Sequence, residues 1–109
     1  MSRKDYEGAL EDINGALDYK PYLENLYLQR GKIKEALDDL AGAKSDYTKA
    51  IMLNENFDLA YLSRGMLKVK EKDYPGARND INKAAELNSE IDGESILTNE
   101  RRREINSSE

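Results

Sequence analysis

The chain is a short acidic polypeptide whose composition excludes several kinds of site. It has 109 residues and a formal net charge of -5, with 39% hydrophobic and 36% charged residues. Cysteine and histidine are absent, which excludes thiol chemistry, imidazole acid/base catalysis and zinc sites built on those ligands. The negative charge argues against a surface that follows nucleic-acid phosphates, so we expect no nucleic-acid partner.

The sequence also gives no sign of membrane targeting. No apolar run approaches the length of a membrane span, and the first residues lack the hydrophobic segment of a secretion signal. We therefore expect one soluble domain with no membrane contact and no cofactor. A cytoplasmic location is our expectation, since the reducing cytosol is compatible with a chain that has no cysteine.

Helical spacing of apolar residues begins near the N-terminus and predicts a first helix over residues 4–19. One face of this helix carries Ala9, Ile13, Ala16 and Leu17. The chain contains no earlier helix to cover that face, and an exposed apolar stripe is a liability or an interface. The stripe could be covered by a preceding segment of the natural protein, by a second copy in a homodimer through residues 4–19, or by nothing if the helix frays.

Four further helices are predicted over residues 22–38, 39–54, 56–72 and 73–88. Pro21 marks the first turn, because proline disfavours helix in the residue before it. Asp73 is a good N-cap with Pro75 in the first turn behind it. Asn54 and Asn88 are expected to end their helices in the left-handed conformation, and Asn56 to cap the following helix.

The last helical pattern, over residues 91–104, is more polar and is typical of a terminal capping helix. Its sequence from 88 to 100 has oxygen-bearing side chains before Gly93, as a calcium loop would. Ser95 takes the apolar position of such a loop, and Asn99 takes the place of its bidentate glutamate. We therefore expect no metal site, and residues 105–109 are expected to be frayed.

Two stretches of the chain repeat each other at a spacing of 34 residues without a gap. In each, a tyrosine precedes a glycine in the first helix, and two alanines share one face of the second helix. Glycine inside a helix costs about 1 kcal/mol relative to alanine, so it needs a packing reason. Small residues where helices cross supply one. The small residues expected at these crossings are Gly31, Gly65, Ala43, Ala50, Ala77 and Ala84, and the repeated tyrosines are Tyr27 and Tyr61.

This helix-turn-helix unit of fixed period resembles the tetratricopeptide repeat family over residues 5–89. The resemblance implies an all-α fold, a right-handed stack of antiparallel helix pairs. The stack would comprise a half repeat, two full repeats and a C-terminal capping helix within residues 1–104. Lys34 and Lys68 depart from the family, which prefers an aromatic residue at their position.

The same resemblance implies a non-catalytic module that binds a protein or peptide along its concave surface. The tyrosines and glycines of the first helices face their partner helices, which leaves another stripe for the groove. Asn25 would clasp a peptide backbone, and Lys32 and Lys70 would attract acidic groups. The candidate groove residues are Asn25, Leu28, Lys32, Glu35, Leu59, Leu62, Met66, Val69 and Lys70.

Leu28 and Ser63 stand where lysine or asparagine pairs would hold the C-termini of chaperones, so that partner is disfavoured. A structural role, in which the first helix extends or dimerises a larger assembly, is the alternative to peptide binding. Paired carboxylates such as Asp38 and Asp39 are the only candidates for catalysis, and solvated charged faces explain them better.

Arginine and aspartate also recur at the repeat spacing, and a structural role fits them better than ligand binding. Arg30 and Arg64 stand on the first helices, and Asp12, Asp46 and Asp80 on the second helices. Each arginine could pair with the aspartate of its own repeat or with that of the preceding one, and the sequence leaves this register open.

Overall fold

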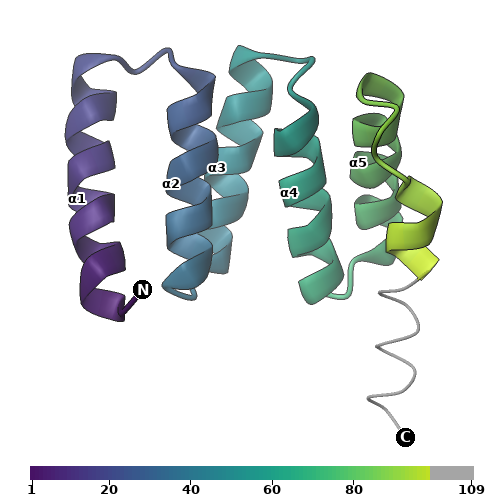
Figure 1. Cartoon of the computed structure of the whole chain (residues 1–109), viewed down its shortest axis with the longest axis horizontal. Coiled ribbons are helices and arrows are strands. Elements are labelled where there is room, and N and C mark those ends of the chain that lie inside the picture. Colours follow the sequence, from purple (N-terminus) through teal and green to yellow (C-terminus); the bar gives the residue numbers. More distant parts are fainter. Residues whose placement is uncertain (99–109) are drawn as a thin grey trace, which may run out of the picture.

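The computed structural model describes residues 1–98, and within that range the chain forms helices and no strand. Five complete helices stand side by side in chain order, with α1 at one end of the row (Figure 1). A sixth helical segment begins at residue 93, after the turn at residues 88–92 that follows α5. The helices are α1 (Arg3–Tyr19), α2 (Glu24–Ala36), α3 (Leu40–Leu53), α4 (Asp58–Lys70) and α5 (Tyr74–Leu87).

The most extensive packing joins α2 to α3 and α4 to α5, and α3 meets α4 less extensively. The predicted all-α stack of helix pairs is therefore confirmed. The expected end of the capping helix at residue 104 and the tail at 105–109 lie outside the described residues.

Glycine on the first helix of each pair allows the two helices to approach closely, as the sequence predicted. A Cβ atom on Gly31 would lie 2.5 Å from Cε1 of Tyr47, and one on Gly65 would lie 2.7 Å from Cγ1 of Ile81. The second helices present small residues at the same crossings, since Ala43, Ala50, Ala77 and Ala84 are all 0% exposed. Residues with side chains of any size at the two glycines would push the helices apart.

A repeated turn joins the two helices of each pair. Asp38 and Lys72 have φ of 65° and 63°, in the left-handed region. The amide of the next residue, Asp39 or Asp73, donates to the carbonyl five residues back at 2.8 or 2.9 Å. This is the hydrogen-bond pattern of a Schellman motif, which satisfies carbonyls left open at the end of a helix.

The following helix then begins at once, because the same aspartates are its N-caps. The carboxylates of Asp39 and Asp73 accept from the backbone N–H groups of Gly42 and Gly76. The predicted cap at Asp73, with Pro75 in the first turn, is therefore confirmed.

Two expectations for the other turns were wrong. Asn54 and Asn88 have extended backbones, with φ of -145° and -140°, rather than left-handed ones. Their side-chain oxygens instead accept from the N–H groups of Asn56 and Glu90, two residues further on, which forms the inter-repeat turn. The amide of Asn56 is used in that turn, and the N-cap of α4 is Phe57, whose side chain makes no capping hydrogen bond.

The first helix is better covered than its sequence suggested. Ile13 and Leu17 are 7% and 5% exposed, because α2 packs against them. Ala16, on the same predicted stripe, is exposed, so only part of the stripe remains open. Ser2 and Asp5 form a capping box that fixes the start of α1.

Candidate peptide-binding groove

A groove opens between α2 and α4, with a residue of α3 at its base. It has a volume of about 340 Å³, and we call it the α2/α4 groove. Apolar and charged residues both contribute to its walls, as is common where a protein binds a peptide. The lining residues are Lys32, Glu35, Tyr47, Leu62, Ser63 and Met66.

Glu35 is the fixed polar group of this groove. The Tyr47 hydroxyl donates to one carboxylate oxygen of Glu35 at 2.6 Å, and Lys70 donates to the other at 2.7 Å. Burial raises the pKa of Tyr47, and its hydrogen bond to Glu35 raises that pKa further, so the phenol stays protonated and donating. Glu35 thereby links α2, α3 and α4 and is held in place before any ligand arrives.

The apolar wall of the groove belongs to α4. Its two residues, Leu62 and Met66, are half-buried and pack, as Val69 outside the lining also does, against a cluster of Ala77, Ile81 and Leu97. Each therefore has a supported side and an accessible side. Leu59, one turn before Leu62, is 46% exposed.

The structure brings only some of the predicted groove residues together. Lys32, Glu35, Leu62 and Met66 line the α2/α4 groove, and Lys70 reaches it through its ion pair with Glu35. Leu28 is 4% exposed and lies in the core formed by α2, α3 and α4, so its side chain is not available to a ligand there. The other predicted residues, Asn25, Leu59 and Val69, lie on the same two helices outside the groove lining.

Sequence reasoning missed Tyr47 as a groove residue. Its place in the repeat pattern predicted packing only, and its ring does pack against Gly31. Its hydroxyl nevertheless reaches Glu35 at the groove. The available signal was that a tyrosine stands where the other repeats have isoleucine, at positions 13 and 81.

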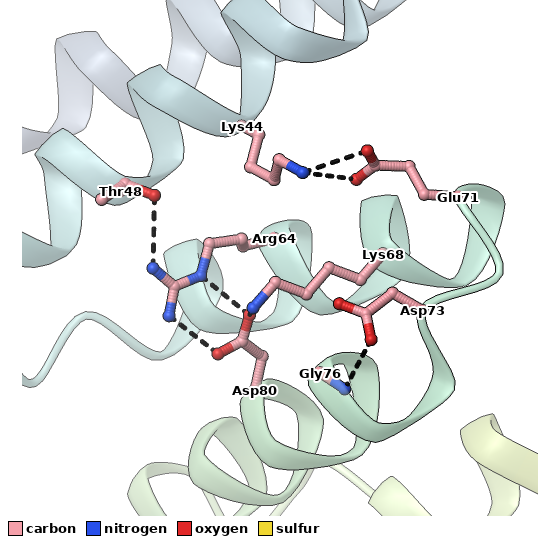
Figure 2. Close-up of polar contacts among 8 residues, drawn as sticks. All are labelled: Lys44, Thr48, Arg64, Lys68, Glu71, Asp73, Gly76 and Asp80. Carbon is pink, nitrogen blue, oxygen red and sulfur yellow. Dashed lines mark hydrogen bonds and ion pairs between the residues drawn. The ribbon is translucent and has the colours of Figure 1, made fainter.

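A larger cleft of about 530 Å³ lies over α3 and α4, and most of its cations are already paired. Figure 2 shows Arg64 between Thr48 and Asp80, and Lys44 directed at Glu71. Arg64 donates to both oxygens of Asp80 at 2.8 Å and to the Thr48 hydroxyl at 3.2 Å. These contacts join α4 to α5 and to α3, which identifies this basic surface as structural.

The same contacts settle the register that the sequence left open. Arg64 pairs with Asp80 of its own repeat, and Arg30 pairs with Asp46 of its own repeat at 2.7 and 2.8 Å. Each arginine also donates to the second helix of the preceding repeat. Arg30 donates to Asn14 of α1, and Arg64 donates to Thr48 of α3. Each arginine therefore ties one helix pair and braces it against the helix before.

Lysine supplies a second cation to each buried carboxylate. Lys68 lies 2.9 Å from Asp80, and Lys34 lies 3.1 Å from Asp46. Burial acts to raise the pKa of Asp80, but the hydrogen bonds from Arg64 and Lys68 outweigh it and hold that pKa below its usual range. The hydrogen bond to Asp80 likewise raises the pKa of Arg64.

Within residues 1–98, no group of three or more acidic, histidine or cysteine side chains is placed to hold a metal ion. In the same part of the chain, no helix combines the length and the hydropathy that a membrane crossing requires.

Residues 24–57 match the sequence model of the tetratricopeptide repeat. No curated protein matches the chain in sequence. The solved first tetratricopeptide repeat domain of Spaghetti (RPAP3), bound to the HSP90 peptide SRMEEVD, is 27% identical with a TM-score of 0.80, over 92% of this chain and 77% of that one. The predicted resemblance is thus confirmed: the chain contains a tetratricopeptide repeat and has the fold of such domains.

Two further solved domains support the same fold. The first tetratricopeptide repeat domain of human RPAP3 is 28% identical with a TM-score of 0.78, over 90% of this chain and 75% of that one. The tetratricopeptide repeat domain of Arabidopsis OM64 is 22% identical with a TM-score of 0.83, over 93% of this chain and 84% of that one.

Proposed function

We propose that the chain is a non-catalytic interaction module that holds a peptide segment of a partner protein in the α2/α4 groove. The observation that carries this proposal is the pairing of an apolar wall, Leu62 and Met66, with Lys32, a cation in the same groove that has no ion-pair partner within residues 1–98. The solved domain of Spaghetti (RPAP3), which is 27% identical to this chain, has a peptide bound, and this supports the same class of activity here.

The chemistry of the groove indicates what kind of peptide fits. Lys32 is exposed and has no carboxylate partner among the described residues, whereas Lys70 is already paired with Glu35. A ligand with an acidic group for Lys32 and an apolar side chain for Leu62 and Met66 matches this arrangement. Leu28 and Ser63 do not form a paired clamp for a C-terminal carboxylate, so we propose recognition of an internal acidic and apolar segment.

Selection from a phage-displayed heptapeptide library tests the proposal. Peptides enriched on the immobilised chain should carry an aliphatic residue next to aspartate or glutamate. Lys32→Glu should weaken the enriched peptides at least tenfold in fluorescence anisotropy, because a charge-assisted contact is replaced by repulsion. Lys49→Glu makes the same charge change on an exposed position of α3 outside the α2/α4 groove, and it should leave their affinity unchanged.

A library that yields no enrichment over the empty support would contradict peptide binding by this chain. Enriched peptides that bind the wild-type chain and Lys32→Glu equally would place recognition elsewhere on the molecule.

A further inference from the structure

The face of α5 that packs against α4 shows which side chains a helix needs in order to pack on such a face. Ala77, Ile81 and Ala84 are 0% exposed beneath α4, with Gly65 above Ile81. Asp80, on the same face, takes Arg64 and Lys68 from α4. A helix that packs on this face therefore contributes a small residue opposite Ile81 and two cations that pair with Asp80.

The corresponding face of α1 is made of the same four residue types. Ala9, Asp12, Ile13 and Ala16 precede Ala77, Asp80, Ile81 and Ala84 by a constant 68 residues. On α1, however, Ala16 and Asp12 are exposed, and Asp12 has no hydrogen bond or ion pair among the described residues. Of this face on α1 only Ile13 is buried, at 7% exposure, whereas all four residues of the α5 face are buried.

Residues of α2 form a second wall beside this uncovered face of α1. Leu26 and Ile33 of α2, with Gln29 between them, join the four α1 residues in lining a cleft of about 340 Å³, which we call the α1/α2 groove. Their counterparts 34 residues later, Ala60 and Leu67, are 0% and 1% exposed. Those two belong to the core into which α2 packs, so the α1/α2 groove repeats the site that a first helix occupies elsewhere in the chain.

The charge of α1 argues against a second copy as the occupant. The helix carries Asp5, Glu7, Glu11, Asp12 and Asp18 but only Arg3 and Lys4, both at its start. A symmetric pairing of two α1 helices through this groove would bring Asp12 toward the acidic side chains of the other copy. Like charges in a partly desolvated interface are unfavourable, and basic ones are favourable.

We propose that the α1/α2 groove docks a basic amphipathic helix of a partner protein, with the face that α4 presents to α5. That face carries an arginine next to a glycine and a lysine one turn later, as Arg64, Gly65 and Lys68 do. The arginine and lysine bind Asp12, and the glycine lies over Ile13. Ala9, Ala16, Leu26 and Ile33 form the apolar floor of the site.

A peptide of residues 56–72, acetylated and amidated at its ends, is the probe, because it contains the α4 face itself. Added to the isotopically labelled chain, it should shift the methyl NMR signals of Ala9, Ile13, Ala16, Leu26 and Ile33. Asp12→Asn should weaken its binding about tenfold, because a bidentate charge-assisted contact is lost. Glu11→Gln, which neutralises the adjacent carboxylate, is the matched control and should have little effect.

A double-mutant cycle identifies the contact. Substitution of the arginine in the peptide by glutamine should weaken binding to the wild-type chain about as much as Asp12→Asn does. The same peptide should then lose little more on the Asp12→Asn chain, because both changes remove one interaction.

A larger side chain placed in the groove gives a second test that leaves the fold intact. Ala16→Glu should abolish the peptide-induced shifts, because position 16 is exposed in the chain alone while its counterpart Ala84 is 0% exposed beneath α4, which leaves no room there for a longer side chain. Gly15→Glu adds the same charge one residue earlier, where a Cβ atom would meet nothing within 4 Å, and it should leave binding unchanged.

Three results would overturn the proposal. Peptide-induced shifts confined to α5 would show that the peptide displaces α4 instead. Equal binding of the peptide to the wild-type chain and to Asp12→Asn would show that Asp12 makes no charge contact with it. A dimer in sedimentation that Ala16→Glu dissociates would assign the groove to a second copy of the chain.

Discussion

At the scale of single residues, Asp46 and Asp80 organise the polar contacts of the molecule. Both are buried, at 3% and 4% exposure, and each takes an arginine and a lysine from the first helix of its own repeat. Two cations explain why lysine stands at positions 34 and 68, where the repeat family prefers an aromatic residue. A carboxylate that is desolvated needs its charge compensated, and Arg and Lys together provide that compensation.

Replacement of Asp80 by asparagine should destabilise the chain by about 2–3 kcal/mol at pH 7, because it leaves Arg64 and Lys68 facing a neutral amide. The pKa of Asp80 is lowered in the folded chain, so its contribution is fully present above the unfolded value of about 3.9. That contribution is lost as the pH falls through the lower folded value. Urea unfolding at neutral pH and in acid should show the wild-type advantage shrinking below about pH 4.

Asp12→Asn is the control for this measurement, because Asp12 holds the same repeat position but is exposed. It should change the free energy of unfolding by less than about 0.5 kcal/mol. A stability difference between wild type and Asp80→Asn that does not vary with pH would contradict the ionised pair.

At the scale of the helix, glycine has opposite meanings at two positions. Gly65 lies at the α4/α5 crossing, where a Cβ atom would meet Ile81 at 2.7 Å and the Ala77 carbonyl oxygen at 3.3 Å. Gly15 lies on an exposed part of α1, where a Cβ atom would meet nothing within 4 Å. Helix propensity favours alanine at both positions, so packing alone separates them.

Gly65→Ala should therefore lower the free energy of unfolding by about 1–3 kcal/mol through overpacking. Gly15→Ala should raise it by about 0.5–1 kcal/mol through helix propensity. Thermal or urea unfolding of the two variants gives the signs directly. Stabilisation by both substitutions would show that α4 and α5 do not need the glycine to approach each other.

Helix positions were predictable from the sequence to within about two residues, and the reason is local. Caps such as Asp39 and Asp73, and the apolar spacing between them, act over a few residues. The conformation of the turns was less predictable. Asn54 and Asn88 were expected to be left-handed, but Asp38 and Lys72 hold that conformation, since the Schellman turn joins the helices of a pair and not the pairs themselves.

At the scale of the whole molecule, the helices form a row in which each packs chiefly against its neighbours (Figure 1). Stability in such a stack is a sum of unit and interface contributions, so the units at the ends are the least protected. α1 packs chiefly against α2, whereas α3 packs against both α2 and α4. The α1/α2 groove is the structural mark of that asymmetry.

Amide hydrogen exchange should accordingly show α1 opening more easily than α3. Protection at Ile13 and Leu17 should be at least tenfold lower than at Tyr47 and Ile51, because α1 can open without disturbing the α2/α3 pair. Two-dimensional NMR in deuterated buffer gives both values in one experiment. Equal protection across α1 and α3 would mean that the chain opens as a single cooperative unit.

The sequence could predict only part of the α2/α4 groove. Lys32, Glu35, Leu62 and Met66 were candidates for peptide contact from their stripe on α2 and α4, and they line one groove. Leu28 shares that stripe but lies in the core, because α3 and α4 close over it. Tyr47 contributes to the groove because its hydroxyl contacts Glu35. That contact depends on how closely α2 and α3 pack, which the sequence does not show.

The sequence by itself determined the period, the helices, the small residues at their crossings and the existence of recurring arginine–aspartate pairs. These follow from side-chain size and spacing along one chain, which repeat every 34 residues. Only the tertiary structure decided the register of those pairs, the burial of Leu28 and how much of the predicted apolar face of α1 stays open beside α2. Each of these depends on distances between helices, and a periodic sequence permits more than one neighbour at each position until the helices are packed.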